Sequence, residues 1–183
     1  MSQAPRGVRL GVDVGTVRVG LAACDPDSIL ATPVKTLSRD AKKNSDIRVI
    51  VREVDERNAV EVFVGLPRTL RGAEKASAEM ARAYALLLVR ALAGAGRDVP
   101  VRLVDERLTT VTAHQALHAA GRDSREHRKL VDQVAAVAIL QHAIDMEKSR
   151  QEAVGELVEL PDPDAVGRID PANEKRNLSS GPQ

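Results

Sequence analysis

The sequence predicts an α/β domain built on a mixed five-stranded sheet with helices on both faces. Three short apolar stretches come first and favour an antiparallel meander, because Gly15 marks a tight turn between the first two. They lie at residues 8–13, 17–24 and 29–37. Two β-branched stretches, 60–66 and 99–104, each follow a helical pattern, which is typical of parallel strands joined by crossover helices.

Helices are predicted over three segments with apolar residues at helical spacing and over one shorter segment that a threonine can cap. These segments are residues 46–57, 73–93, 129–148 and, for the short one, 109–120. In the second, Met80, Tyr84 and Leu88 share a face and Gly94 ends the helix. Pro33 has no amide proton to donate, so the third strand is expected at an edge of the sheet.

Length and charge divide the chain into one domain, residues 1–150, and an acidic tail, residues 151–183, which we expect to be disordered. The chain has 183 residues, of which 43% are hydrophobic, enough for one domain with a core. The tail holds seven acidic and three basic residues, so the first 150 residues carry +5 of a total charge of +1. This mild basic excess favours a phosphate-rich partner.

Neither a membrane span nor a signal peptide is predicted, because no apolar stretch is long enough and residues 1–6 lack an apolar core. Cys24 is the single cysteine, which excludes an intramolecular disulfide and fits a cytoplasmic protein. We interpret it as a small strand residue. The alternative, an intermolecular disulfide, requires Cys24 to be exposed.

Three acids stand alone in otherwise apolar surroundings. Asp13 ends the first strand, Glu106 follows the last strand, and Asp132 lies in the final helix on a face with Ala136 and Ile139. A buried carboxylate is costly unless a cation meets it. The two strands would deliver their acids at the same edge of the sheet, where open α/β sheets place their sites. Together the three acids predict a nuclease-type centre for two hard divalent cations, Mg²⁺ or Mn²⁺.

Asp105 competes with Glu106 for this role. Side chains alternate across a strand, so Asp105 and Glu106 point to opposite faces and only one of them can meet Asp13. The other would pair with Arg107 or with a backbone amide. We take Glu106 as the ligand.

Four motifs closely resemble those of the YqgF/RuvX family. They are residues 11–22 (Gly-Val-Asp-Val-Gly-Thr-Val-Arg-Val-Gly-Leu-Ala), 64–67 (Val-Gly-Leu-Pro), 105–110 (Asp-Glu-Arg-Leu-Thr-Thr) and 132–136 (Asp-Gln-Val-Ala-Ala). The resemblance covers residues 8–147 and implies an RNase H-like fold. It also implies a hydrolase acting on ester bonds, described either as a nuclease that matures pre-16S ribosomal RNA or as a Holliday junction resolvase.

The resemblance carries the catalytic and metal-ligand roles onto Asp13, Glu106 and Asp132. One departure matters, because related resolvases carry a second acid three residues further along the last helix, where this chain has Ala135. Three carboxylates can hold two ions with the help of waters and substrate, and weaker metal affinity is expected.

Basic and hydroxyl side chains near the predicted site are candidates for substrate binding. They are Thr16, Arg18, Arg68, Arg71, Arg107, Arg125, Arg128 and Lys129. The segment 39–48 adds further basic residues. Arg18 has two readings, contact with the scissile phosphate or neutralisation of Asp13. Together the basic segments would form a phosphate footprint, although any one of them alone is better interpreted as a solvated loop.

Phe63 and Tyr84 are the only aromatic residues, so base stacking of a single strand is disfavoured and a structured or branched nucleic acid is expected. His114 and His118 have a spacing that zinc enzymes use, but no third ligand is apparent. Junction DNA and ribosomal precursor RNA both stay open as substrates. Symmetric resolution of a junction favours a homodimer.

Two other functions fit parts of the sequence. An Asp-x-Gly-Thr turn after the first strand also occurs in actin-like and sugar-kinase-like ATPases, but those need two such domains. A non-catalytic nucleic-acid-binding or ribosome-assembly factor could keep this fold, and the intact Asp13, Glu106 and Asp132 argue against it.

Overall fold

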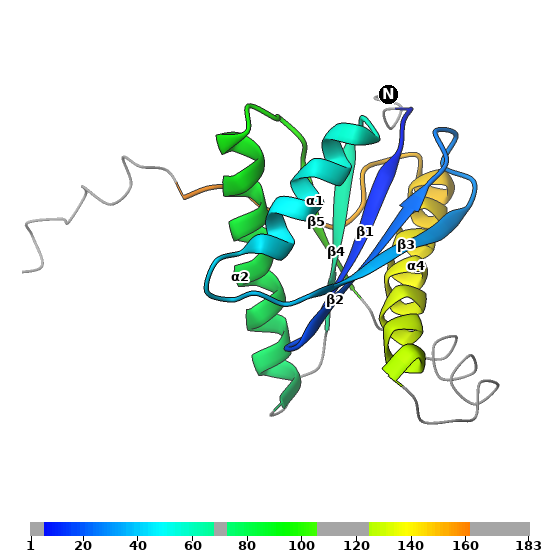
Figure 1. The fold of residues 1–183 in the computed structure, drawn as a ribbon. Helices are drawn as coiled ribbons and strands as arrows, with labels where there is room; N and C mark the ends of the chain where they lie inside the picture. The colour runs from blue at the N-terminus through cyan, green and yellow to red at the C-terminus, as the bar shows by residue number, and fades with distance from the viewer. Residues whose placement is uncertain (1–5, 68–72, 106–124, 162–183) are drawn as a thin grey trace, which may run out of the picture.

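The computed structural model describes residues 6–67, 73–105 and 125–161 (Figure 1). Its centre is a six-stranded mixed sheet with strand order β3-β2-β1-β4-β5-β6. The strands are β1 (Arg9–Val14), β2 (Arg18–Cys24), β3 (Ala31–Ser38), β4 (Glu61–Leu66), β5 (Val101–Asp105) and β6 (Glu156–Leu157). The mixed α/β architecture predicted from the sequence is therefore confirmed.

The first three strands form the expected antiparallel meander. β1 turns back into β2 through Gly15, whose amide donates to the carbonyl of Arg18 at 2.8 Å. β3 pairs with β2 and lies at the edge of the sheet, which confirms the position predicted from Pro33. The ladder shifts register between Leu21 and Ala22, where Pro33 is the partner of Ala22.

The remaining strands extend the sheet on the other side of β1. β4 runs parallel to β1 and β5 runs parallel to β4, as the crossover pattern predicted. The expected count of five strands is wrong, because β6 pairs antiparallel with β5 at the far edge. A strand of two exposed residues shows no alternation of apolar and polar side chains from which a strand could be predicted. Its place is fixed by tertiary contacts, including the ion pair of Arg82 with Glu156 at 2.7 Å.

Helices cover both faces of the sheet (Figure 1). α1 (Ser45–Glu56) and α2 (Ala73–Gly94) lie on one face over a core that includes Val12, Leu88 and Leu103. α4 (Arg125–Arg150) lies on the other face, where Ala136 and Leu140 pack with residues such as Phe63 and Val104. The short helix expected over 109–120 falls outside the described residues.

Residues 151–161, the first part of the predicted tail, lie against the sheet. Val154 is buried beside α4, and the amide of Val158 donates to the carbonyl of Val101 at 2.9 Å. Residues 162–183 lie outside the described part of the chain. Cys24 is a buried free thiol in β2, in keeping with its interpretation as a small strand residue.

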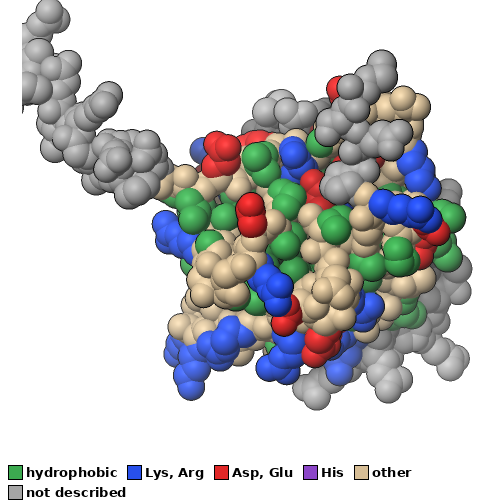
Figure 2. All heavy atoms as spheres, turned by 90° about the horizontal axis from the view of Figure 1, so that it is seen from above, with side chains coloured by type: hydrophobic (Ala, Val, Ile, Leu, Met, Phe, Trp, Pro, Cys, Tyr) green, Lys and Arg blue, Asp and Glu red, His purple; other side chains and the backbone are tan. Residues whose placement is uncertain are grey.

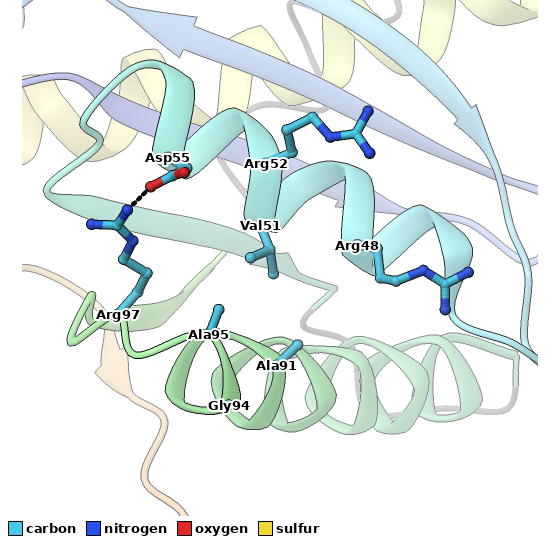
Figure 3. Close-up of a pocket in the computed structure, with 8 residues that line it drawn as sticks. All are labelled: Arg48, Val51, Arg52, Asp55, Ala91, Gly94, Ala95 and Arg97. Carbon is cyan, nitrogen blue, oxygen red and sulfur yellow. Dashed lines mark ion pairs between the residues drawn. The ribbon is translucent and has the colours of Figure 1, made fainter.

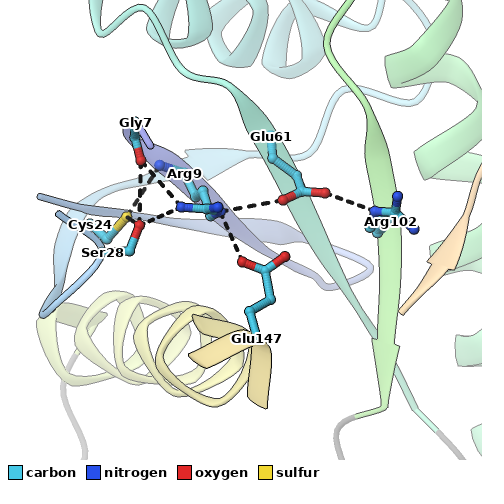
Figure 4. Close-up of polar contacts among 7 residues, drawn as sticks. All are labelled: Gly7, Arg9, Cys24, Ser28, Glu61, Arg102 and Glu147. Carbon is cyan, nitrogen blue, oxygen red and sulfur yellow. Dashed lines mark hydrogen bonds and ion pairs between the residues drawn. The ribbon is translucent and has the colours of Figure 1, made fainter. Parts of the chain in front are cut away.

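A buried ion cluster joins the N-terminal ends of β1 and β4 to the C-terminal part of α4 (Figure 4). Nε of Arg9 lies 3.3 Å from a carboxylate oxygen of Glu61 and 3.2 Å from one of Glu147, and Glu61 also pairs with Arg102 at 2.8 Å. Burial raises the pKa of the Glu147 carboxyl to about 7. The cluster anchors the end of α4 that is remote from Asp13.

The face at the N-terminal end of β1 carries acidic and basic side chains interspersed with apolar ones (Figure 2). Among the described residues, no helix has the length and apolar character needed to cross a bilayer.

Candidate functional site

Asp13 and Asp132 meet at the C-terminal end of β1 because two glycines let α4 lie against the sheet. Asp13 is paired with Gly20 across β1 and β2. A Cβ on Gly20 would lie 2.0 Å from the backbone oxygen of Asp132, and one on Gly11 would lie 2.7 Å from that of Ala136. Only hydrogen fits at these two positions, so the helix backbone packs directly on the strands and brings Asp132 to Asp13.

The environment of Asp13 disfavours its ionised form. Burial, and then the nearby charge of Asp132, raise the pKa of Asp13 from 3.8 to about 6. Both causes disfavour the ionised form, since burial removes hydrating water and a second negative charge repels the first. Asp13 therefore lies in a position where a cation would be strongly stabilising.

Asp132 already has a cationic neighbour. Nε of Arg18, at the start of β2, donates to a carboxylate oxygen of Asp132 at 2.5 Å. The pair is partly open to solvent, with 31% of the Arg18 side chain and 20% of the Asp132 side chain exposed. Arg18 therefore neutralises a carboxylate in this structure, but the carboxylate is that of Asp132 and not, as predicted, that of Asp13.

Asp105 does not share the face of Asp13. Leu103 packs in the core under α1 and α2, whereas Val104 packs in the core under α4. Asp105 follows Val104 in β5, so the alternation of side chains directs it to the α1 and α2 face. Of the two acids that compete for the third ligand position, Asp105 is thereby placed on the wrong side of the sheet.

Glu106 lies outside the described residues, so the structure describes only two of the three carboxylates of the predicted metal centre, Asp13 and Asp132. Within residues 6–67, 73–105 and 125–161, no group of three His, Cys, Asp or Glu side chains is placed to hold a metal ion. His114 and His118, the zinc candidates, also fall outside this part of the chain.

The predicted substrate-binding residues are only partly visible. Thr16 is exposed in the turn after β1, and Lys129 is exposed near the start of α4. Arg68, Arg71 and Arg107 lie outside the described residues, as do the side chains of Arg125 and Arg128. The structure thus places Thr16, Arg18 and the N-terminal part of α4 at one end of the sheet.

Comparison with known proteins identifies the family. The family model described as "RuvX: Holliday junction resolvase" matches residues 7–146. The chain belongs to the RuvX family. The resemblance read from the four motifs is confirmed.

Close relatives of this RuvX chain carry the name "Putative pre-16S rRNA nuclease". The protein of Mycobacteroides abscessus is 54% identical over 143 residues, covering 78% of this chain and 84% of the relative. The protein of Streptomyces avermitilis is 49% identical over 156 residues, covering 85% and 96%. Among solved structures, RuvC of T. thermophilus in complex with Holliday junction substrate matches with a TM-score of 0.47 and 17% identity, over 82% of this chain and 99% of that one.

Two features of this RuvX site were missed in the sequence. The first is the close approach of α4 at Gly20, a residue that reads as an ordinary member of an apolar strand. The second is a hydrogen-bonded link between β3 and α4, in which Thr36 donates to the carbonyl of Lys129 at 2.8 Å and receives a bond from Gln133 at 3.3 Å. Gln133, polar in an apolar helix, was the one available signal for this link.

Proposed function

We propose that this RuvX protein is a metal-dependent nuclease that hydrolyses phosphodiester bonds in structured nucleic acid. The observation that carries the proposal is the meeting of Asp13 and Asp132, from opposite ends of the chain, at the C-terminal end of β1. Burial and the neighbouring charge of Asp132 raise the pKa of Asp13, and an acid shifted by burial and a specific charged neighbour is typical of functional sites.

The residues fit hard divalent cations. Carboxylate oxygens are the donors that Mg²⁺ and Mn²⁺ prefer, and a cation would offset the burial and the repulsion by Asp132 that raise the pKa of Asp13. Asp13, Asp132 and Glu106 would hold two such ions. When bound, the ions would supply a nucleophilic hydroxide and stabilise the charge that develops on the phosphate.

Glu106 is included on the strength of its place in the sequence. Val104, two residues earlier, belongs to the core on the α4 side, and alternate residues of a strand share a face. The same alternation directs Asp105 away. The pattern thus supports Glu106 as the third acid beside Asp13 and Asp132.

Arg18 holds the charge of Asp132 while the ions are absent. A metal ion on Asp132 would compete with the Arg18 guanidinium for the same carboxylate. A guanidinium freed in this way would lie beside the site and could donate two hydrogen bonds to a phosphate. Arg18 would then serve as counter-ion of Asp132 in the metal-free protein and as phosphate contact in the loaded one.

The remaining contacts to the substrate are assigned to Thr16, Arg68, Arg71, Arg107, Arg125, Arg128 and Lys129. We favour precursor ribosomal RNA as the substrate because the relatives carry that name, and we place the activity in the cytoplasm, where a free thiol such as Cys24 persists. Trimming an RNA end needs one active site, whereas symmetric resolution of a junction needs a homodimer.

The test is digestion of a precursor 16S fragment and a four-way junction side by side, by wild type, Asp13→Asn and Asp132→Asn. We expect cleavage with Mg²⁺ or Mn²⁺, none with chelator, and a loss of at least 10²-fold in each variant. Cleavage that persists in both variants contradicts the proposal. Tight binding by wild type without any cleavage would instead favour a non-catalytic assembly factor.

A further inference from the structure

A shallow groove runs between α1 and α2 on the face of the sheet opposite α4 (Figure 3). It encloses about 540 Å³ and has an apolar floor, where Val51 of α1 faces Ala91 of α2 and Ala95, the residue that follows this helix. A Cβ on Gly94, which also lines the groove, would meet nothing within 4 Å, so the groove is open there. It belongs to neither the carboxylate site nor the buried ion cluster.

The groove is basic. Arg48, Arg52 and Arg97 line it, against one acid, Asp55. Asp55 is already ion-paired with Arg97, as Figure 3 shows. Arg48 and Arg52 are exposed, one helical turn apart on α1, and neither has an acidic partner within the described part of the chain.

The positive charge continues toward the carboxylate site. Arg48 and Arg52 both lean toward the N-terminal end of α1 (Figure 3). Lys42 and Lys43 precede that end and are exposed. This segment begins beside the β1–β2 turn, where the amide of Arg39 donates to the carbonyl of Val17 at 2.8 Å.

The basic strip consists of Lys42, Lys43, Arg48 and Arg52, and two nearby acids, Asp40 and Glu56, reduce its charge from +4 to +2. The carboxylate of Asp40 accepts backbone hydrogen bonds from Lys42 and Lys43 and one from the hydroxyl of Ser45. Glu56 is exposed and lies one helical turn beyond Arg52, at the C-terminal end of α1. Arg39, by contrast, is committed to the buried Asp46 at 3.2 Å and is not part of the strip.

We propose that Lys42, Lys43, Arg48 and Arg52 form a second phosphate-binding track, which carries the backbone of the nucleic acid from the carboxylate site into the α1–α2 groove. The inference rests on the proposed nuclease function for the identity of the polyanion. Four exposed cations without an ion-paired acid among the described residues, two of them linked by the bond that Arg48 donates to the carbonyl of Lys43 at 3.0 Å, match a phosphate backbone. The near absence of aromatic residues matches binding by charge and shape.

The experiment measures binding separately from cleavage. Asp13→Asn protein, in chelator, is titrated onto a fluorescent precursor 16S fragment at several salt concentrations, with and without Arg48→Glu/Arg52→Glu. We expect the added double substitution to weaken binding at least ten-fold and to lower the slope of log K against log salt by about 2, one for each lost phosphate contact. Arg48→Gln/Arg52→Gln should lower the slope equally with a smaller loss of affinity.

The matched control is Lys148→Glu/Arg150→Glu, which makes the same charge change at the remote end of α4, where both residues are exposed. It should leave affinity and slope near those of the parent. Equal losses in control and test variants, or an unchanged slope in the test variant, would overturn the proposal. So would displacement of the RNA by micromolar inorganic phosphate or mononucleotide, which would indicate a small-ligand site.

Failure of the nuclease function gives a different result. With Asp13 intact, Arg48→Glu/Arg52→Glu should need a higher concentration of the RNA for half-maximal cleavage, whereas the control Lys148→Glu/Arg150→Glu should cleave as wild type does. A wild-type protein that binds through the track and never cuts would contradict the nuclease assignment and support the track.

Discussion

At the scale of single residues, the site is a compromise between stability and function, and Asp13 shows it most clearly. Its folded pKa of about 6 lies above the unfolded value of 3.8. Ionisation therefore costs the fold nothing below pH 3.8, costs progressively more between pH 3.8 and 6, and costs its full amount above pH 6. The full cost is about 3 kcal/mol, since one pKa unit corresponds to about 1.4 kcal/mol.

Removing that charge should stabilise the metal-free protein. We expect Asp13→Asn to raise the free energy of unfolding by about 1–3 kcal/mol at pH 8 in chelator, and by close to nothing at pH 4. Urea denaturation at the two pH values measures the difference. A variant that is less stable than wild type at pH 8 would show that Asp13 is not under electrostatic strain.

Arg18 offers a second test at this scale. Nε of Arg18 lies 2.5 Å from a carboxylate oxygen of Asp132, so Arg18 competes with cations for this carboxylate. We therefore expect Arg18→Gln to bind Mn²⁺ about ten-fold more tightly and to cleave nucleic acid more slowly. Calorimetric titration with Mn²⁺ gives the affinity without any substrate. Arg90→Gln, an exposed arginine on α2, is the control and should change neither quantity. Weaker Mn²⁺ binding in Arg18→Gln would contradict the competition.

At the scale of elements, the decisive contact is that of α4 with β1 and β2. At one end, the lack of a side chain at Gly20 allows the helix to pack close to Asp13. At its other end, the ion pair of Glu147 with Arg9 in the buried ion cluster anchors the helix. Neither contact contributes a group to the chemistry. Both determine where Asp132 lies.

A methyl group at Gly20 should separate the two acids. Gly20→Ala would place its Cβ 2.0 Å from the backbone of Asp132, so α4 must shift. We expect a loss of about 1–3 kcal/mol in stability and a much larger loss of cleavage, because the acids no longer act together. Gly94→Ala is the matched control, since nothing lies within 4 Å and alanine favours a helix. Full cleavage by Gly20→Ala would contradict the close-packed site.

The opposite end of α4 should respond to loss of Arg9 in a pH-dependent way. Arg9→Met leaves Glu61 and Glu147 buried without their shared cation, which costs about 3–5 kcal/mol. The pKa of Glu147 is raised to about 7, so at pH 5 it is neutral in the folded protein and the loss should be smaller than at pH 8. Denaturation curves at both pH values check this. A larger loss at pH 5 would contradict the assignment.

At the scale of the whole molecule, the sequence predicted the architecture better than it predicted the individual contacts. Gly15 predicted the meander, and Pro33 predicted the edge strand. The proximity of Asp13 and Asp132 was predicted because each is an acid in an apolar segment without a local partner. These signals are local in the chain. β6 was not predictable, because two exposed residues pair with β5 only through contacts that form after folding.

The details that failed are those that depend on helix-to-sheet register. The sequence around Gly20 does not indicate which residue of α4 packs on it. The requirement for glycine at this position is therefore not visible in the sequence either. The same holds for Arg18, whose partner is Asp132, 114 positions away in the chain. A side chain's partner across such a distance is set by packing and is invisible to spacing rules.

The most direct test of the central claim is Mn²⁺ binding to wild type, Asp13→Asn, Asp132→Asn and the double variant, measured by calorimetry without nucleic acid. If the two carboxylates hold the same ions, each single variant should lose at least ten-fold in affinity, and the double variant should lose less than the sum of the two free-energy changes. Wild-type affinity in either single variant, or strictly additive losses, would mean that the two acids do not share a metal site.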